Sequence, residues 1–192
     1  MMQDANTIST ARLKLRPFAT SDTDAFAELN SDPQVMADLG GPLTRQQSDT
    51  KLSGYIATAA QNGFGRFVVE DKCGKFLGYC GIMERNIDAL GVHYDLGWRL
   101  ARSAWGNGFA SEAAVAILAD AFSRLNFPEV LAYTGPDNLR SQEVMERLKL
   151  RRRKDLDFSM KLDSMKGLWH GLVWSAQPSA YKNKSQTWFQ SV

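Results

Sequence analysis

One segment of the chain combines residue types that can bind phosphate. It lies between a predicted strand ending at Leu100 and the clearest predicted helix, and it reads Trp105-Gly106-Asn107-Gly108-Phe109-Ala110-Ser111-Glu112. Glycines let the backbone turn tightly and place its N–H groups against a ligand with no side chain in the way. The helix start adds unpaired N–H donors and about half a positive charge. These features indicate a phosphate-binding loop, although a simple strand-to-helix turn has the same composition.

Two well-known phosphate-binding patterns do not fit this segment. The dinucleotide fingerprint needs a third glycine where Ser111 stands, and the P-loop needs a Gly-Lys-Ser/Thr run that the segment lacks. A second polar group, Asn138-Leu139-Arg140-Ser141, precedes another predicted helix. Taken alone, it is typical of a helix start in which Asp137 or Asn138 is the cap and Ser141 lies in the first turn.

Hydrophobic periodicity predicts the elements that must position these residues. Alternating patterns predict strands at 12–18, 65–71, 76–84, 92–100, 129–134, 156–161 and 172–175. Helices are predicted after Ser21–Asp24, from the Thr44/Gln47 capping box to Gly63, at 110–125 and at 138–150. The order β-α-α-β-β-β-α-β-α-β-β predicts an α+β fold with a strand–helix–strand crossover in its second half.

Composition excludes several classes of protein. The chain has 192 residues, 44% of them hydrophobic, and its 23 basic and 21 acidic side chains give a formal charge of +2. Proteins that neutralise nucleic-acid phosphates have a clear basic surplus, and a bilayer span needs a far longer apolar run. We therefore expect no nucleic-acid partner and no membrane. The N-terminus lacks a signal-peptide pattern, which favours a cytoplasmic location. Cys73, Cys80, His93 and His170 lack metal-ligand spacing, so we expect reduced thiols and no metal.

Five stretches, in the same order along the chain, resemble the GNAT acetyltransferase family. More narrowly, they resemble the branch of enzymes that acetylate the N-termini of ribosomal proteins (RimJ/RimL type). The stretches are residues 12–17 (Arg-Leu-Lys-Leu-Arg-Pro), 31–36 (Ser-Asp-Pro-Gln-Val-Met), 95–100 (Asp-Leu-Gly-Trp-Arg-Leu), 105–113 (Trp-Gly-Asn-Gly-Phe-Ala-Ser-Glu-Ala) and 136–141 (Pro-Asp-Asn-Leu-Arg-Ser).

The resemblance implies an acyl-CoA N-acyltransferase fold, with a mixed central sheet that splays between its fourth and fifth strands and is flanked by helices. It implies acetyl-CoA as co-substrate, its pyrophosphate held by the amides of residues 106–111 and its pantetheine arm paired with the free edge of strand 92–100. The residues implied in CoA binding are Leu96, Trp98, Leu100, Trp105, Gly106, Asn107, Gly108, Phe109, Ala110, Ser111, Asn138 and Ser141.

Catalysis, by the same resemblance, is direct transfer of the acetyl group to a primary amine. A backbone N–H near residues 97–99 stabilises the oxyanion, and Ser141 is the candidate acid beside the departing thiolate. An amine with a pKa near 10.4 is charged at neutral pH and must lose a proton. Asp95 is the first candidate for the base, Glu84 the second and His93 the third. A solvated strand residue or an ion-pair partner is the alternative for Asp95.

The chain departs from the family pattern at several positions. Trp105 stands where the pyrophosphate loop usually has Gln or Arg, and Lys149 stands where relatives have a helix-ending glycine. Asp157-Phe158-Ser159-Met160 lacks the His-Pro pair of the branch, which puts an acceptor contact in doubt. The basic run 151–154 is interpreted as a solvated edge or as a patch that faces the adenosine phosphate.

We thus expect one acetyltransferase domain over residues 1–176 and a C-terminal tail over 177–192, as a monomer or homodimer. The acceptor is a protein or peptide N-terminus or a small-molecule amine. The alternatives are a catalytically inactive CoA-binding sensor or interaction module and, less favoured, an RNA- or ribosome-binding protein that uses the basic run.

Overall fold

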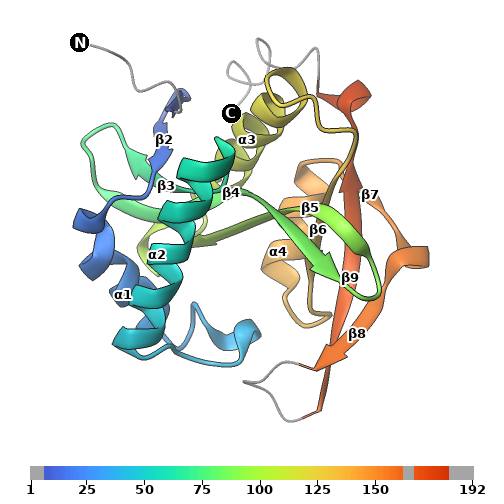
Figure 1. Cartoon of the computed structure of the whole chain (residues 1–192), viewed down its shortest axis with the longest axis horizontal. Helices are drawn as coiled ribbons and strands as arrows, with labels where there is room; N and C mark the ends of the chain where they lie inside the picture. Colours follow the sequence, from blue (N-terminus) through green and yellow to red (C-terminus); the bar gives the residue numbers. More distant parts are fainter. Residues whose placement is uncertain (1–6, 162–166, 182–192) are drawn as a thin grey trace.

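A mixed β-sheet runs through residues 7–161 and 167–181, the part of the chain that the computed structural model describes (Figure 1). Its order is β1-β2-β3-β4-β5-β6-β9-β7, and β8 pairs with β9 outside this path. All pairings are antiparallel except that of β5 with β6. The strands are β1 (Ile8–Ser9), β2 (Leu13–Pro17), β3 (Arg66–Asp71), β4 (Phe76–Ile87), β5 (Gly91–Leu100), β6 (Val130–Thr134), β7 (Arg151–Arg152), β8 (Phe158–Lys161) and β9 (Leu168–Ala176).

Helices cover both faces of this sheet. One face carries α1 (Thr23–Ser31) and α2 (Arg45–Asn62), which lie side by side in Figure 1 and pack an aromatic cluster against β3 and β4. The other face carries α3 (Phe109–Ser123) and α4 (Leu139–Arg147), whose apolar residues share one core with β2 to β6. Burial of these two clusters is the main favourable term in folding, because each apolar side chain is removed from water.

The predicted helix signals are confirmed at α2. The Thr44 hydroxyl accepts the Gln47 N–H at 3.2 Å, and the Gln47 side chain accepts the Thr44 N–H at 2.8 Å, which closes the capping box. Gly63 ends the helix with a left-handed φ of 70°, a conformation that glycine adopts without steric cost.

The sheet opens between β5 and β6. β5 pairs with β4 along ten residues, from Gly91 to Leu100, but with β6 only at Asp95, which faces Leu131. Past that pair the two parallel strands diverge, so one edge of β5 has backbone groups with no strand partner among the residues that the structure describes. This confirms the expected fold class, a mixed sheet splayed between the strands predicted at 92–100 and 129–134.

Several boundaries differ from those predicted. β1 and β7 were not expected, because a two-residue strand exists only through its pairing with a neighbour. β4 continues to Ile87, into the polar stretch expected to be a loop. α4 ends at Arg147 rather than at 150, since Lys149 takes a left-handed φ of 57°.

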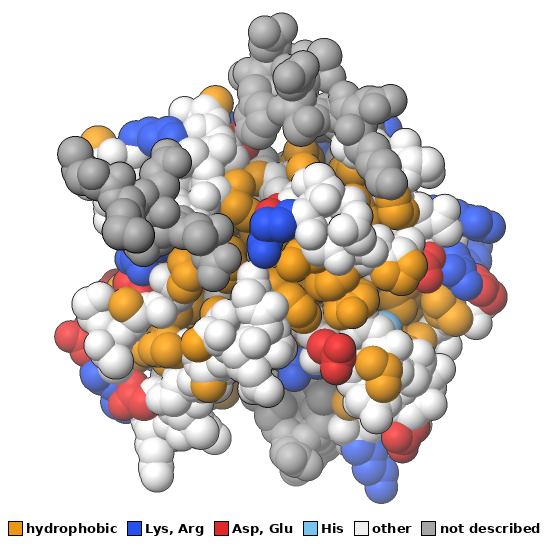
Figure 2. All heavy atoms as spheres, turned by 45° about the horizontal axis from the view of Figure 1, so that its top comes forward, with side chains coloured by type: hydrophobic (Ala, Val, Ile, Leu, Met, Phe, Trp, Pro, Cys, Tyr) orange, Lys and Arg blue, Asp and Glu red, His pale blue; other side chains and the backbone are white. Residues whose placement is uncertain are grey.

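The basic run 151–154 lies at β7 and the turn after it. Arg152 pairs with Asp157 at 2.6 Å and lies over the Trp174 ring, and Arg153 pairs with Asp155 at 2.8 Å. The run therefore lies at an edge of the sheet, and two of its three arginines, Arg152 and Arg153, have acidic partners. On the face drawn in Figure 2, basic and acidic side chains are interspersed near the edges and hydrophobic side chains gather in the middle.

The first described residues of the expected tail dock on the domain. The Tyr181 side chain is 3% exposed, packs against Phe122 and donates its hydroxyl proton to the Leu148 carbonyl at 2.6 Å. Trp188 and Phe189, the other aromatic residues of the tail, lie outside the described residues. None of the helices in 7–161 and 167–181 is both long and apolar enough to span a membrane.

Candidate active site

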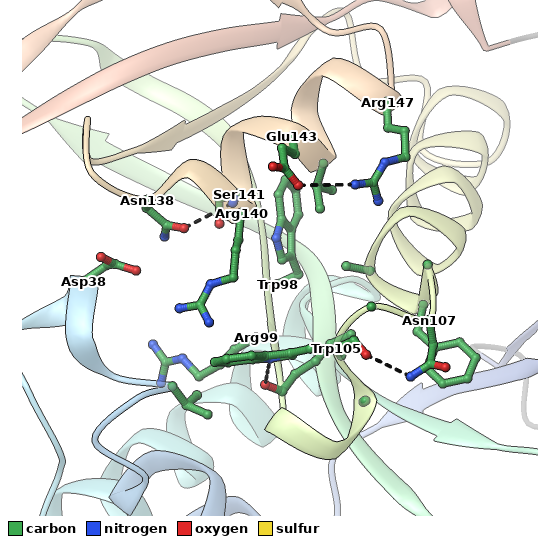
Figure 3. A pocket seen from close by; sticks show the side chains of 18 of the residues that line it. Asp38, Trp98, Arg99, Trp105, Asn107, Asn138, Arg140, Ser141, Glu143 and Arg147 are labelled. Atoms are coloured by element: carbon green, nitrogen blue, oxygen red, sulfur yellow. Dashed lines mark hydrogen bonds and ion pairs between the residues drawn. The ribbon is translucent and has the colours of Figure 1, made fainter.

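A pocket of about 660 Å³ lies where the sheet opens. Its walls come from the end of β5, the 104–110 segment, the first turns of α4 and the segment between α1 and α2 (Figure 3). Elements far apart in sequence thus form one site, and both polar segments singled out from the sequence, 105–112 and 138–141, contribute to it.

The start of α3 presents free backbone donors to this pocket. Gly106 and Gly108 both have a φ of 74°, and Gly108 is the N-terminal boundary residue of α3. The Glu112 N–H donates to the Gly108 carbonyl, so the N–H groups of residues 109–111 precede the first intrahelical bond. The Gly108 boundary has no side-chain cap. This is the geometry in which a helix start binds phosphate oxygens.

Arg12 clamps this loop to β2. Its Nε donates to Glu112 Oε2 at 2.6 Å, and its Nη1 donates to the Asn107 carbonyl at 3.0 Å. Glu112 also accepts from the Thr10 hydroxyl at 2.5 Å and from the Arg12 N–H at 2.9 Å. Burial opposes ionisation of Glu112, but these hydrogen bonds more than offset it and hold its pKa below the ordinary value. Glu112 is therefore an ionised anchor, and Arg12 balances its charge beside the phosphate-type site.

Two further arginines border the pocket on α4. The Arg140 guanidinium lies 3.8 Å from the centre of the Trp105 ring, a cation–π contact. Arg147 lies 3.6 Å from Glu143 and 3.4 Å from the Ser111 hydroxyl. In Figure 3, Arg147 lies at the Asn107 end of the pocket, whereas Arg140 extends toward the end where Asp38 lies.

Asn138 and Ser141 hold the start of α4 together. The Ser141 N–H donates to Asn138 Oδ1 at 3.1 Å, so Asn138, rather than Asp137, is the cap of α4. Both residues also line the pocket, and the bond uses the Ser141 backbone rather than its hydroxyl. The cap and a site role are therefore compatible.

The expected CoA-binding residues divide into two groups. Ten of them line the pocket: Trp98, Leu100, Trp105, Gly106, Asn107, Gly108, Phe109, Ala110, Asn138 and Ser141. Leu96 is 2% exposed and belongs to the core between the sheet and α3. Ser111 is the third residue of α3 and lies outside the lining, and its hydroxyl contacts Arg147.

The candidate base Asp95 lies in a buried ion pair. Its Oδ2 accepts from Arg66 Nη2 at 2.5 Å, and both side chains are less than a tenth exposed. Arg66 also donates to the carbonyls of Gly81, Asp95 and Gly97. A Cβ on Gly97 would lie 2.7 Å from Arg66 Nη2, so any larger residue there would displace the Arg66 guanidinium. Asp95 thus fixes Arg66 under β5 and does not line the pocket.

The other two candidate bases also lie outside the lining. Glu84 is exposed and pairs across the strands with Tyr94, on the sheet face opposite to that of Asp95. His93 is half-buried, its Nδ1 lies 2.9 Å from the Gly91 carbonyl, and its Nε2 has no hydrogen-bond partner among the described residues.

Sequence reasoning missed the charged residues of the lining: Asp38, Arg99, Arg140, Glu143 and Arg147. Arg99 and Arg140 stood inside quoted stretches but were given no role. The helical spacing of Arg140, Glu143 and Arg147 could have indicated one face of α4. Nothing local signals Asp38, because its place depends on how the segment between α1 and α2 folds over the sheet.

Comparisons with known proteins agree on one family. A family model described as Acetyltransferase (GNAT) domain matches residues 12–151. YkkB of Bacillus subtilis (strain 168) is 33% identical over 141 residues, which cover 72% of this chain and 81% of that protein. An N-acetyltransferase of Bacillus licheniformis, p20, is 29% identical over 145 residues, 74% of this chain and 80% of p20.

Solved structures match over nearly the whole chain. An acetyltransferase from Agrobacterium tumefaciens str. C58 aligns with a TM-score of 0.76 and 27% identity, over 92% of this chain and 97% of that one. RimL, a ribosomal L7/L12 α-N-protein acetyltransferase, has a TM-score of 0.72, 17% identity and coverage of 89% and 93%. The Vibrio cholerae spermidine N-acetyltransferase, solved in complex with CoA and spermine, has a TM-score of 0.72 and 18% identity. The alignment covers 91% of this chain and 100% of that one. The last two show the shared fold alone.

Proposed function

Since this chain belongs to the GNAT acetyltransferase family and is an acyltransferase, we propose that it moves an acetyl group directly from acetyl-CoA to a primary amine. One observation carries the proposal. The pocket joins the free amides at the start of α3 to the unpaired edge of β5. A phosphate-binding helix start beside an open strand edge suits a ligand that has a pyrophosphate at one end and a chain of amides at the other.

The residues present fit CoA. The amides of 109–111, together with the turn at Gly106 and Gly108, would hold the pyrophosphate, and Arg147 is the nearest cation on α4. Trp98, Leu100 and Val144 give apolar walls for the pantetheine arm. The edge of β5 past Asp95 offers the backbone groups for its amides, and the Asn138 side chain borders the same path.

The proposed transfer reaction needs few catalytic groups from the protein. The amine nitrogen bonds to the thioester carbonyl carbon, the C–S bond breaks, and the thiolate takes a proton. In our proposal a β5 backbone N–H near residues 97–99 stabilises the oxyanion, and the Ser141 hydroxyl donates a hydrogen bond or a proton to the departing sulfur. Arg66 supports the first step, because it fixes the β5 backbone at Asp95 and Gly97.

Asp95 is the proposed base, ahead of Glu84 and His93. Because its carboxylate already accepts from Arg66 and lies outside the pocket lining, a water molecule has to connect it with the amine.

We also propose that the chain belongs to the RimJ/RimL branch, on the basis of the five quoted stretches. We propose a cytoplasmic location because Cys73 and Cys80 are both free thiols. Proteins of this fold act on a ribosomal protein and on spermidine, so the fold leaves the acceptor open.

The direct test is release of free CoA thiol from acetyl-CoA in the presence of amines and N-terminal peptides. We expect turnover that depends on the amine and that stops when the amine is replaced by its N-acetyl derivative. Binding of acetyl-CoA without turnover across a broad panel would instead favour a non-catalytic CoA-binding module.

A further inference from the structure

Arg99 is a buried cation with most of its donors unused. It lies near the end of β5, lines the pocket and is 8% exposed. Its Nη1 donates to Asn30 Oδ1 at 2.5 Å, and its guanidinium lies 5.4 Å from the centre of the Tyr79 ring. Its Nε is buried with no hydrogen-bond partner, and the described residues provide no partner for Nη2. The free Nε and Nη2 form the edge with which arginine binds a carboxylate through two parallel bonds.

The surroundings of Arg99 have surplus positive charge. Arg99 has no acidic partner among the described residues, and neither has Lys51 of α2. Burial, the largest cause, lowers the pKa of Lys51; Tyr79 opposes this shift, whereas Arg99, Arg66 and Arg85 add to it. The Asp95 carboxylate, on the same face of β5 as Arg99, is paired with Arg66. An unpaired buried charge is costly, so an anion that completes this site is strongly favoured.

Arg99 lies at the opposite end of the pocket from the proposed pyrophosphate site. Figure 3 shows its guanidinium at the end of the pocket where Asp38 and Arg140 lie, away from Asn107 and the start of α3. Arg99 and Gly97 share one face of β5, two residues apart, which corresponds to roughly 7 Å between their backbone positions. Residues 97–99 are where the proposed function puts the reacting carbonyl, so an anion at Arg99 lies only a few bonds from the attacking nitrogen.

We propose that the Nε/Nη2 edge of Arg99 binds a carboxylate of the acceptor, so that the enzyme acetylates a small amine that carries a carboxylate a few bonds from its nitrogen, an amino-acid type of substrate. This inference rests on the proposed function. Arg140 adds positive charge at the same end of the pocket, and the Asp38 carboxylate gives an incoming ammonium group an opposite charge. The α-carboxyl group at a protein N-terminus is in a peptide bond, so that substrate lacks the α-carboxylate of an amino acid, and a polyamine has no carboxylate at all.

Matched pairs of amines test the proposal. Glycine, phenylalanine and glutamate are each compared with the corresponding α-carboxamide in the thiol-release assay. We expect kcat/KM to be on the order of tenfold or more higher for the carboxylate member of at least one pair, because an arginine left unpaired in a buried site costs binding. Arg99→Gln should reduce that ratio to about one, and Arg99→Lys should restore it only in part.

Arg147→Gln is the matched control, since it removes a pocket cation at the other end. It should weaken acetyl-CoA binding and leave the carboxylate preference unchanged, whereas Arg99→Gln should do the reverse. A preference for the carboxamides, equal rates within every pair, or a carboxylate preference that survives in Arg99→Gln would overturn the proposal. If acetyl-CoA itself does not bind, the proposed function fails instead.

A binding measurement on the unaltered protein tests the carboxylate site without requiring turnover and without requiring that a variant folds. N-acetylglycine is titrated into the protein, with and without CoA, while the ¹⁵N–¹H signals of arginine Nε groups are recorded. We expect one buried Nε signal to shift with N-acetylglycine and not with N-acetylglycinamide, and to be missing in Arg99→Lys. Identical responses to the two probes, or none to either, would refute a carboxylate site at Arg99.

Discussion

Lys149 holds a backbone conformation that its side chain makes costly. Its φ of 57° ends α4, and its N–H donates to the Glu146 carbonyl, so the turn is required although the residue is exposed. Lys149→Gly should raise the free energy of unfolding by about 0.5–1 kcal/mol, because glycine adopts this backbone conformation without strain. The gain is reduced in part because glycine also makes the unfolded chain more flexible. Urea unfolding of the variant and of the unaltered protein measures this difference in free energy.

Asn126 offers the matched control, since its φ is 54° but asparagine tolerates the left-handed region. Asn126→Gly should therefore stabilise less than Lys149→Gly. Equal effects, or a loss of stability in Lys149→Gly, would mean that the strain does not reside in the lysine.

Ser141 has a structural role through its backbone N–H and a proposed chemical role through its hydroxyl, so the two roles can be tested separately. Its backbone N–H, not its hydroxyl, bonds to Asn138, so Ser141→Ala should leave the stability of α4 and acetyl-CoA affinity nearly unchanged. If the hydroxyl assists the leaving thiolate, kcat should fall on the order of tenfold or more. Asn138→Ala, in contrast, loses the cap and should cost about 1 kcal/mol of stability. An unaltered kcat in Ser141→Ala would restrict Ser141 to the helix start.

Single residues were also where prediction from sequence reached its limit. Residue type marked Asp95 as a candidate base, but its partner Arg66 lies on another strand, and only the sheet brings the two together. Arg99 gave no signal for the same reason, since its burial and its unused donors depend on α1 and α2 packing over β4 and β5.

At the scale of elements, the join between β2 and α3 controls the loop. Glu112 holds Arg12, Thr10 and, through Arg12, the Asn107 carbonyl. Because the pKa of Glu112 is lowered in the folded state, its contribution to stability is present above its ordinary pKa of 4.5 and is lost as the pH falls through the lower folded value.

Glu112→Gln should therefore be less stable at neutral pH, and its free energy of unfolding should decline less steeply than that of the unaltered protein below pH 4.5. Urea titrations at several pH values check this. Glu143→Gln, a change at an exposed glutamate of α4, should keep the original pH dependence. If the free energy of unfolding of Glu112→Gln and that of the unaltered protein changed in parallel with pH, the charge of Glu112 would make no contribution to stability.

The larger elements were predictable because their signals are local. Alternation located β2 to β5, helical periodicity located α3, and the Thr44/Gln47 box and Gly63 gave both ends of α2. The two-residue strands β1 and β7 and the extension of β4 to Ile87 have no such signal, because pairing with β2, β9 and β5 creates them.

For the whole molecule, a formal charge of +2 is compatible with an anion-binding enzyme because the charge is local. Backbone amides at the start of α3 and the arginines at positions 99, 140 and 147 lie at the pocket, while Arg152 and Arg153 are paired elsewhere. Tyr181, which lies past the expected boundary at 176, packs against Phe122 of α3 and donates to the Leu148 carbonyl at the end of α4.

The central claim is that this pocket binds acetyl-CoA at the start of α3, and thermal unfolding with saturating acetyl-CoA tests it most directly. A ligand at about 100 times its Kd stabilises the folded state by about 2.7 kcal/mol. For a domain of this size that corresponds to a rise in Tm of roughly 5–10 °C.

Gly108→Val and Gly74→Val provide a matched pair for that measurement. Both glycines have a left-handed φ, 74° and 81°, so both variants should lose Tm through backbone strain, but only Gly108 lies at the pocket. The account predicts a rise in Tm with acetyl-CoA for the unaltered protein and for Gly74→Val, and little or none for Gly108→Val. An unchanged Tm of the unaltered protein at saturating acetyl-CoA, or an equal rise in both variants, would contradict it.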